Sequence, residues 1–276
     1  MAETESVSAL EKSKLFVDED MSEAEFYSLS SGVAGVFVAR SPGRTTPNED
    51  AAALIQYGKD CTMLIVADGA GGARGGDKAS ALAVKKMLSS LEKGVKEKSE
   101  SRTAIINGFE SANEAVNNLG LGAATTLAVV EVQKQTIRHY HAGDSLILAV
   151  SNHGNTKLQN VAHSPVGYAV ESGLIDEKEA MTHEDRHIVS NMIGSEDMHI
   201  SIGSPIELAA RDTVLVASDG LSDNLSIDEI VERVRSGSLS ESLQVLAIDC
   251  TERMHNDSGK TPSKPDDLTV IAFRFN

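Results

Sequence analysis

The sequence lacks several features that would narrow its class at once. Its 276 residues include no tryptophan, and aromatic residues make up only 4% of the chain. No run of apolar residues approaches the roughly 18 needed to span a membrane. The first 25 residues are acidic and have no basic start followed by an apolar run, so no secretory signal is expected. We therefore expect a cytoplasmic protein with no membrane partner.

Cysteine and basic residues are also scarce. The two cysteines, Cys61 and Cys250, have no metal-type spacing, and we expect them to be reduced packing residues. The 25 Lys and Arg residues stand against 41 Asp and Glu, which gives a formal net charge of -16. Such a surface repels nucleic-acid phosphates, so a nucleic-acid partner is not expected. A phosphorylated substrate stays possible, because divalent cations held by carboxylates invert the local field.

The residue pattern predicts an α+β fold in which helices pack outside antiparallel sheets. Helical spacing predicts helices at about 77–93, 101–119, 227–236 and 239–254. Residues 1–30 are expected to form a flexible acidic tail with one short helix around 9–16, followed by one domain over 31–276. The polar stretch 152–197 is expected to be a surface flap, and the strand-like runs at 125–132, 137–141 and 146–150 an antiparallel meander. The other strand-like runs lie at 36–39, 51–56, 62–67, 198–202, 213–217 and 268–273.

The most informative feature is a pair of apolar runs that end in the same dipeptide. One leads into Asp68-Gly69 and the other, 151 residues later, into Asp219-Gly220. A buried carboxylate is costly unless a cation or several donors accompany it. Two acidic segments precede strands instead of following them, namely Asn48-Glu49-Asp50 and Asp266-Asp267. We therefore expect these strand ends to meet and to share a cation.

Each acidic segment also has a simpler explanation when it is taken alone. The glycine-rich stretch 68–77 could be a tight turn, but it lacks the Gly-Lys-Ser/Thr ending of a phosphate loop. Mg²⁺ and Mn²⁺ prefer oxygen ligands, so this stretch also suits a metal site. Asp223 shares a helix face with Asp219 if the chain turns helically there, or is a solvated acid. Residues 141–145, which include Asp144, have a common hairpin-turn sequence.

Read together, the segments resemble the metal-dependent PPM, or type 2C, serine/threonine protein phosphatases in their bacterial form. The signatures of a covalent nucleophile, such as Gly-x-Ser-x-Gly, are missing, and the histidines are expected to be surface or core residues. The six motifs follow the family's order over about 33–274, and they are Asn48-Glu49-Asp50, Val66 to Gly72, Gly122 to Thr126, Ala142 to Ser145, Ser218 to Asp223 and Asp266 to Val270.

The resemblance implies a four-layer α/β/β/α sandwich with a binuclear Mn²⁺ or Mg²⁺ centre at one end. On that pattern Asp68 bridges two metals and the carbonyl of Gly69 binds one of them, while Asp219 and Asp266 complete the other. Asp50 holds metal-bound water, with Glu49 a weaker candidate, and Asp144 joins Asp219 in a weaker third site. A shared metal-bound water then attacks phosphorus directly, so no protein nucleophile is needed.

Three departures from the family pattern concern the surroundings of this centre. Arg44, the candidate phosphate ligand, lies four residues before Asn48 where the family usually has three. Ala70 stands where animal members have a histidine that protonates the leaving group. Asp267 replaces a usual asparagine, which adds a negative charge near the centre and is expected to alter metal affinity.

The expected function is hydrolysis of phosphoserine and phosphothreonine in proteins, including products of a cognate kinase, by a monomeric enzyme. Two alternatives stay open at this point. The chain could be a weakly active relative that serves as a phosphoprotein-binding regulatory module, which the displaced Arg44 favours slightly. It could also act on a small phosphorylated metabolite, because the site would bind the phosphate group and the surrounding surface would bind the remainder of the substrate.

Overall fold

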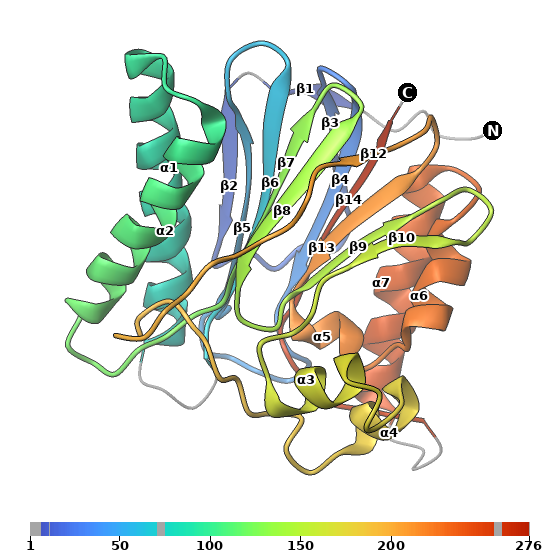
Figure 1. Cartoon of the computed structure of the whole chain (residues 1–276). Coiled ribbons are helices and arrows are strands. Elements are labelled where there is room, and N and C mark those ends of the chain that lie inside the picture. Colours follow the sequence, from blue (N-terminus) through green and yellow to red (C-terminus); the bar gives the residue numbers. More distant parts are fainter. Residues whose placement is uncertain (1–6, 11, 71–74, 257–260, 276) are drawn as a thin grey trace.

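The computed structural model describes residues 7–10, 12–70, 75–256 and 261–275, and it folds them into two facing sheets with helices outside (Figure 1). The first sheet has the order β1-β3-β4-β14-β13-β9-β10 and the second β11-β8-β7-β6-β5-β2, with β12 also paired to β8. Within these sheets only the short β1–β3 pair is parallel among the described strands. The predicted four-layer sandwich is confirmed.

The strands of the first sheet are β1 (Ser8–Ala9), β3 (Glu25–Leu29), β4 (Gly32–Ala39), β14 (Leu268–Phe275), β13 (Thr213–Ala217), β9 (Leu146–Val150) and β10 (Thr156–Gln159). Those of the second sheet are β11 (Ser201–Ile202), β8 (Thr136–Ala142), β7 (Leu127–Gln133), β6 (Cys61–Asp68), β5 (Asp50–Gln56), β2 (Ser13–Val17) and the short β12 (Ile206–Glu207). The helices are α1 (Gly76–Glu97), α2 (Ser101–Asn117), α3 (Pro165–Glu171), α4 (Glu177–Thr182), α5 (Asp219–Ser222), α6 (Ile227–Val234) and α7 (Leu239–His255).

The apolar strands are buried on both faces, which explains their continuous runs of Val, Ile, Leu and Ala. In β6, Leu64 and Val66 face the other sheet, while Met63 and Ile65 contact the layer formed by α1 and α2. The first sheet alternates in the same way between the inter-sheet core and the layer of α6 and α7. Each fully buried side chain of this size contributes about 1.5–3 kcal/mol. The two sheets are thereby held face to face, and their strand ends are brought together.

The prediction of a flexible N-terminal tail is wrong for the described residues 13–29. Ser13–Val17 forms strand β2, not a helix, and pairs antiparallel with β5. Strand β3 pairs with β4, and Phe16 and Phe26 are buried in the core. Both strands lie near a sheet edge. In β3, Glu25 is exposed, whereas Phe26 and Tyr27, which point to opposite faces of the sheet, are both buried. The domain therefore includes residues that the sequence analysis assigned to the tail.

The predicted three-stranded meander over 125–150 is also wrong in its last step. Strands β7 and β8 pair in the second sheet, but β9 lies in the first sheet between β13 and β10. Residues 143–145 therefore connect the two sheets and do not form a hairpin. The expected flap begins later than 152, because β10 extends the sheet; α3 and α4 follow it at the lower end of the view (Figure 1).

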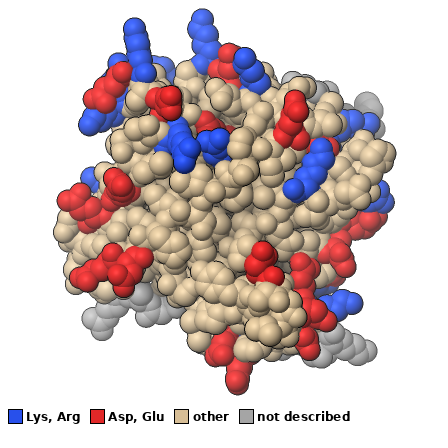
Figure 2. Space-filling model, viewed as in Figure 1, with Lys and Arg blue, Asp and Glu red and all other residues tan. Residues whose placement is uncertain are grey.

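Two further observations concern composition and surface. Both cysteines are free and buried, as predicted. Among the described helices, none is long and apolar enough to cross a membrane. On the face in Figure 2, most Lys and Arg side chains lie in the upper part, and the lower part over α3 and α4 carries mainly Asp and Glu.

Candidate metal centre

The first half of the site is the open end of the β5–β6 hairpin. Strand β5 begins at Asp50 and β6 ends at Asp68, and the antiparallel register sets these two residues directly opposite each other. Asp50 is buried, and its Oδ2 accepts a hydrogen bond of 2.7 Å from the hydroxyl of Ser218. Two acids on facing positions repel each other, and like charges opposite one another destabilise a strand pair. This costly pair of facing carboxylates lies at one end of the sandwich.

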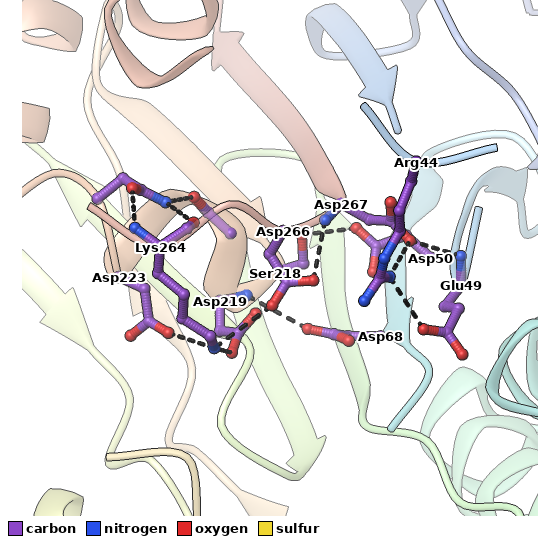
Figure 3. Close-up of polar contacts among 12 residues, drawn as sticks. Arg44, Glu49, Asp50, Asp68, Ser218, Asp219, Asp223, Lys264, Asp266 and Asp267 are labelled. Carbon is purple, nitrogen blue, oxygen red and sulfur yellow. Dashed lines mark hydrogen bonds and ion pairs between the residues drawn. The ribbon is translucent and has the colours of Figure 1, made fainter. Parts of the chain in front are cut away.

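The second half comes from the other sheet. Strand β13 leads through Ser218 into Asp219, which starts α5, and Asp266 lies two residues before β14. The backbone N–H of Asp219 donates to Asp68 Oδ2 at 3.4 Å, so the two Asp-Gly motifs meet across the sheets (Figure 3). The acidic strand ends therefore meet, as predicted. Residues 71–74 of the first glycine-rich motif lie outside the described residues.

The glycine after each aspartate permits close passage of a neighbouring chain segment. A Cβ atom on Gly69 would lie 2.4 Å from the carbonyl oxygen of Gly76 and 2.7 Å from that of Glu49. A Cβ on Gly220 would lie 2.0 Å from the carbonyl oxygen of Asp267. All three distances are far inside van der Waals contact, so each motif needs a residue without a side chain at this point. The repeated dipeptide thus lets four acidic segments pack into one end of the fold.

Asp144 enters the site from the connection between the two sheets. Gly143 has φ of +114°, and its N–H donates to His163 Nδ1 at 3.1 Å, which ties the turn to the flap. Burial raises the pKa of Asp144, and the charge of Asp219 raises it further. Asp144 and Asp219 line the same cavity.

Electrostatics at this end disfavour a full set of charges without cations. Burial raises the pKa of Asp68 well above its usual range, and the charges of Asp219 and Asp50 add to the effect. The pKa of Asp50 is raised mainly by burial, although the Ser218 hydroxyl opposes the shift. Carboxylate oxygens of this kind are the ligands preferred by Mg²⁺ and Mn²⁺, and cations would let the acids ionise. The donor chemistry fits a divalent cation.

The side chains are nevertheless not arranged as a finished metal site. Over the described part of the chain, no three His, Cys, Asp or Glu side chains are close enough together to hold one ion. Figure 3 shows a lysine, Lys264, among these acids. Lys264 Nζ is 2.8 Å from Asp219 Oδ2, 2.5 Å from Asp223 Oδ2 and 3.4 Å from Asp266 Oδ2. Burial alone would lower the pKa of Lys264, but attraction to Asp219 and Asp223 outweighs it and raises that pKa.

The phosphate-ligand candidate Arg44 lies at the other side of the cluster. Its Nη1 is 3.1 Å from Glu49 Oε2 and 3.7 Å from Asp267 Oδ2, and its side chain is 39% exposed. The carboxylate of Asp267 accepts hydrogen bonds of 2.7 Å from the backbone N–H groups of Ser41 and Glu49. Asp267 thus fixes both ends of the loop that carries Arg44. The negative charge that Asp267 adds, compared with the family's usual asparagine, therefore faces this loop and Arg44.

The sequence analysis placed Thr126, Ser145 and Ser218 within its motifs but gave them no role, and it did not name Lys264. Thr126 accepts a hydrogen bond from the N–H of Asp68 at 2.9 Å and pairs with Ser145 at 2.6 Å. The hydroxyl of Ser218 holds Asp50 and accepts from the N–H of Thr269 at 3.0 Å. The signal for Ser218 was its place directly before the second Asp-Gly. Lys264 gave only a weak signal, two residues before Asp266.

The flap covers one side of the acidic end. A cavity of about 660 Å³ joins Asp144, Asp219 and Asp223 to flap residues that include Met181 and Arg186. The segment from His183 to His187 reads His-Glu-x-x-His, a zinc-protease pattern that requires both histidines on one helix face. Residues 184–187 form turns after the end of α4, and the N–H of Asp185 donates to His183 Nδ1 at 3.1 Å. The pattern is therefore not in its zinc-binding geometry.

Two packed, mainly antiparallel sheets with acids from both sheets at one end match the arrangement that the resemblance to type 2C phosphatases implies. The family model described as protein phosphatase 2C matches residues 43–249. The protein phosphatase PhpP of Streptococcus pneumoniae is 28% identical over 222 residues, covering 78% of this chain and 86% of that protein. The chain belongs to the protein phosphatase 2C family.

Solved structures agree with this assignment. The serine/threonine phosphatase of S. agalactiae superimposes with a TM-score of 0.73 at 25% identity, covering 88% of this chain and 99% of that one. The catalytic domain of the phosphatase PstP, solved with two manganese ions, superimposes with a TM-score of 0.67 at 23% identity, covering 87% and 96%. The latter similarity concerns the fold.

Proposed function

We propose that this enzyme hydrolyses phosphoserine and phosphothreonine in proteins, with divalent cations held at the acidic end of the sandwich. One observation carries the proposal: Asp50, Asp68, Asp219 and Asp266, from motifs far apart in the sequence, gather where the two sheets end. The membership in the phosphatase 2C family supports the same reaction. The manganese ions of the PstP structure support Mn²⁺ or Mg²⁺ as the cations.

Each acid has a proposed role that follows from its position. Asp68, which faces both Asp50 and Asp219, would be shared between two cations, with the carbonyl of Gly69 beside it. Asp219 and Asp266 would complete one cation site, and Asp50 would orient water bound to the cations. Bound divalent cations supply a water of lowered pKa that attacks phosphorus. Asp144 and Asp219 would form a third, weaker site.

The remaining residues would bind and orient the phosphoryl group. The guanidinium of Arg44 would pair with phosphate oxygens, which requires it to leave Glu49 and Asp267. The Asp267 carboxylate keeps the Arg44 loop anchored meanwhile, through its two backbone hydrogen bonds. Ala70 provides no proton donor, so water would protonate the leaving alkoxide. We propose a cytoplasmic monomer that acts on the products of a cognate kinase.

A phosphoprotein-binding module with slow turnover is a second candidate, and Lys264 favours it. Its ammonium contacts Asp219 and Asp266, the two acids proposed to complete one cation site. A permanently bound ammonium would leave the phosphate-binding Arg44 intact and weaken hydrolysis. The two candidates differ in the rate of turnover with Mn²⁺.

The test is hydrolysis of a phosphothreonine peptide with Mn²⁺ and with EDTA. We expect turnover that depends on Mn²⁺ and is abolished in Asp68→Asn and Asp219→Asn, because each loses a negative ligand oxygen. Asp60→Asn is the matched control, since Asp60 is an exposed residue at the opposite end of the β5–β6 hairpin. Undiminished turnover in EDTA, or in either site variant, would refute the metal mechanism. A folded protein that binds the peptide without hydrolysing it would favour the second candidate.

A further inference from the structure

The backbone of Lys264 is held in place by Asn224, a residue 40 positions earlier in the sequence. Its backbone N–H donates to Asn224 Oδ1 at 2.8 Å, and its carbonyl accepts from Asn224 Nδ2 at 2.9 Å. Asn224 is fully buried, and its Nδ2 also donates to the carbonyl of Gly220. The following residue, Pro265, restricts the backbone of Lys264 to extended conformations. The lysine is thus anchored directly to the segment that carries Asp219 and Asp223.

The ammonium group lies where three carboxylates point. It is within 2.8 Å of Asp219 and Asp223 and 3.4 Å from Asp266. The lysine side chain is 24% exposed and those of Asp219 and Asp223 are 24% and 15% exposed, so water screens this cluster only in part. Three acids that converge on one ammonium leave a net negative charge. That charge still attracts a divalent cation, which would compete with the ammonium for the same oxygens.

We propose that Lys264 is a built-in cation that competes with a divalent ion for Asp219 and Asp266. The inference rests on the proposed function, since those two acids are the ligands proposed there for one of the cations. A divalent ion bound to the same oxygens would lie within a few ångströms of the ammonium and be repelled by it. Mn²⁺ therefore binds at Asp219 and Asp266 in a separate, weaker step, after the lysine side chain has moved toward solvent.

This arrangement has a consequence for the metal-free protein. The ammonium offsets part of the repulsion among the acids, so the fold does not depend on a metal ion to keep them together. Without the ammonium, the same acids bind metal more tightly and repel each other more strongly when metal is removed. The two effects have opposite signs, and a structural role for Lys264 alone predicts only the second.

The test compares Lys264→Met and Lys264→Gln with the unmodified chain and with Lys93→Met. Lys93 is an exposed residue of α1, and its replacement changes the net charge by the same amount. Titration calorimetry with Mn²⁺, after EDTA treatment, gives the affinity and the number of bound ions. We expect the weaker Mn²⁺ step to tighten by about tenfold or more in both Lys264 variants, since a tenfold change corresponds to about 1.4 kcal/mol of removed repulsion.

Thermal unfolding gives the second readout. In EDTA the Lys264 variants should unfold at a lower temperature than the unmodified chain. Addition of Mn²⁺ should then raise their unfolding temperature by more than it raises that of the unmodified chain. Lys93→Met should match the unmodified chain in both. Equal Mn²⁺ affinity and number of ions in all four proteins would overturn the inference on Lys264.

The outcomes separate this inference from the proposed function. If the Lys264 variants gain Mn²⁺ affinity but no protein hydrolyses the peptide, the competition stands and the phosphatase proposal fails. If the unmodified chain hydrolyses the peptide with Mn²⁺ but the Lys264 variants bind Mn²⁺ no more tightly than it does, the phosphatase proposal stands and the competition fails. Absence of Mn²⁺ binding in all the proteins would overturn both.

Discussion

Replacement of Asp267 tests how the acidic end holds the loop of Arg44. Asp267 is 3% exposed, and its two oxygens accept separate hydrogen bonds of 2.7 Å from the N–H groups of Ser41 and Glu49. Hydrogen bonds to a charged group contribute about 1.5–3 kcal/mol each, so Asp267→Ala should lower the free energy of unfolding by about 3–6 kcal/mol. Asp267→Asn keeps one acceptor oxygen and turns a donor toward the other N–H. It should therefore lose about half as much.

The measurement is urea unfolding in EDTA, followed by the KM for a phosphothreonine peptide with Mn²⁺. The looser loop presents Arg44 less often, so Asp267→Ala should raise KM by about tenfold, or roughly 1.4 kcal/mol of binding. Asp212→Ala is the control. Asp212 is also buried and accepts from the N–H of Ala209 at 2.8 Å and from Lys157 at 2.6 Å, but it lies at the far end of β13.

Asp267→Ala and Asp212→Ala should both lose stability, and only Asp267→Ala should change KM. Equal losses below about 1 kcal/mol for Asp267→Ala and Asp267→Asn would refute the reasoning, because the two hydrogen bonds would then contribute little. A KM change in Asp212→Ala of the same size would show that general destabilisation, and not the loop, controls peptide binding.

Two further predictions concern the same end of the fold. Arg44→Ala should raise KM for the phosphopeptide at least about tenfold, since an arginine–phosphate pair is charge-assisted. Arg40→Ala is the control and should leave KM unchanged. Equal KM values for Arg44→Ala and Arg40→Ala would show that Arg44 does not bind the phosphate. Gly220→Ala should lower the free energy of unfolding by about 3 kcal/mol, because its Cβ would meet the carbonyl of Asp267 at 2.0 Å. Gly173→Ala, at φ of +72° with open space around it, should lose only about 1–2 kcal/mol, and equal urea midpoints for the two would contradict the packing argument.

Local patterns explain what the sequence analysis predicted correctly. The spacing of Ile105, Phe109, Ala112 and Val116 is helical, and these residues lie on the buried face of α2. An apolar run followed by an acid and a glycine marks the end of a buried strand, so the meeting of the acidic segments could be expected. The helix follows from local spacing alone, whereas the second inference compared the same dipeptide at two places 151 residues apart.

The errors arose where the decisive partner is far away in sequence. Nothing between β8 and β9 indicates that β9 pairs with β13, more than 60 residues later, and not with β8. The acidic N-terminal segment resembled a tail because its polar residues outnumber the few apolar ones, such as Phe16 and Phe26, that the structure buries. Lys264 belongs to the same class, since Asn224, 40 residues earlier, determines where it lies.

The position of the acids at the junction of the two sheets has a thermodynamic consequence. Asp50 and Asp68 belong to one sheet and Asp219 and Asp266 extend from the other, so an ion shared between them would act as a cross-link in a protein whose cysteines are both free. A ligand that binds only the folded state at 100 times its Kd adds about 2.7 kcal/mol to the free energy of unfolding. On the proposed function, the supply of metal would therefore determine how long the protein lasts as well as how fast it turns over.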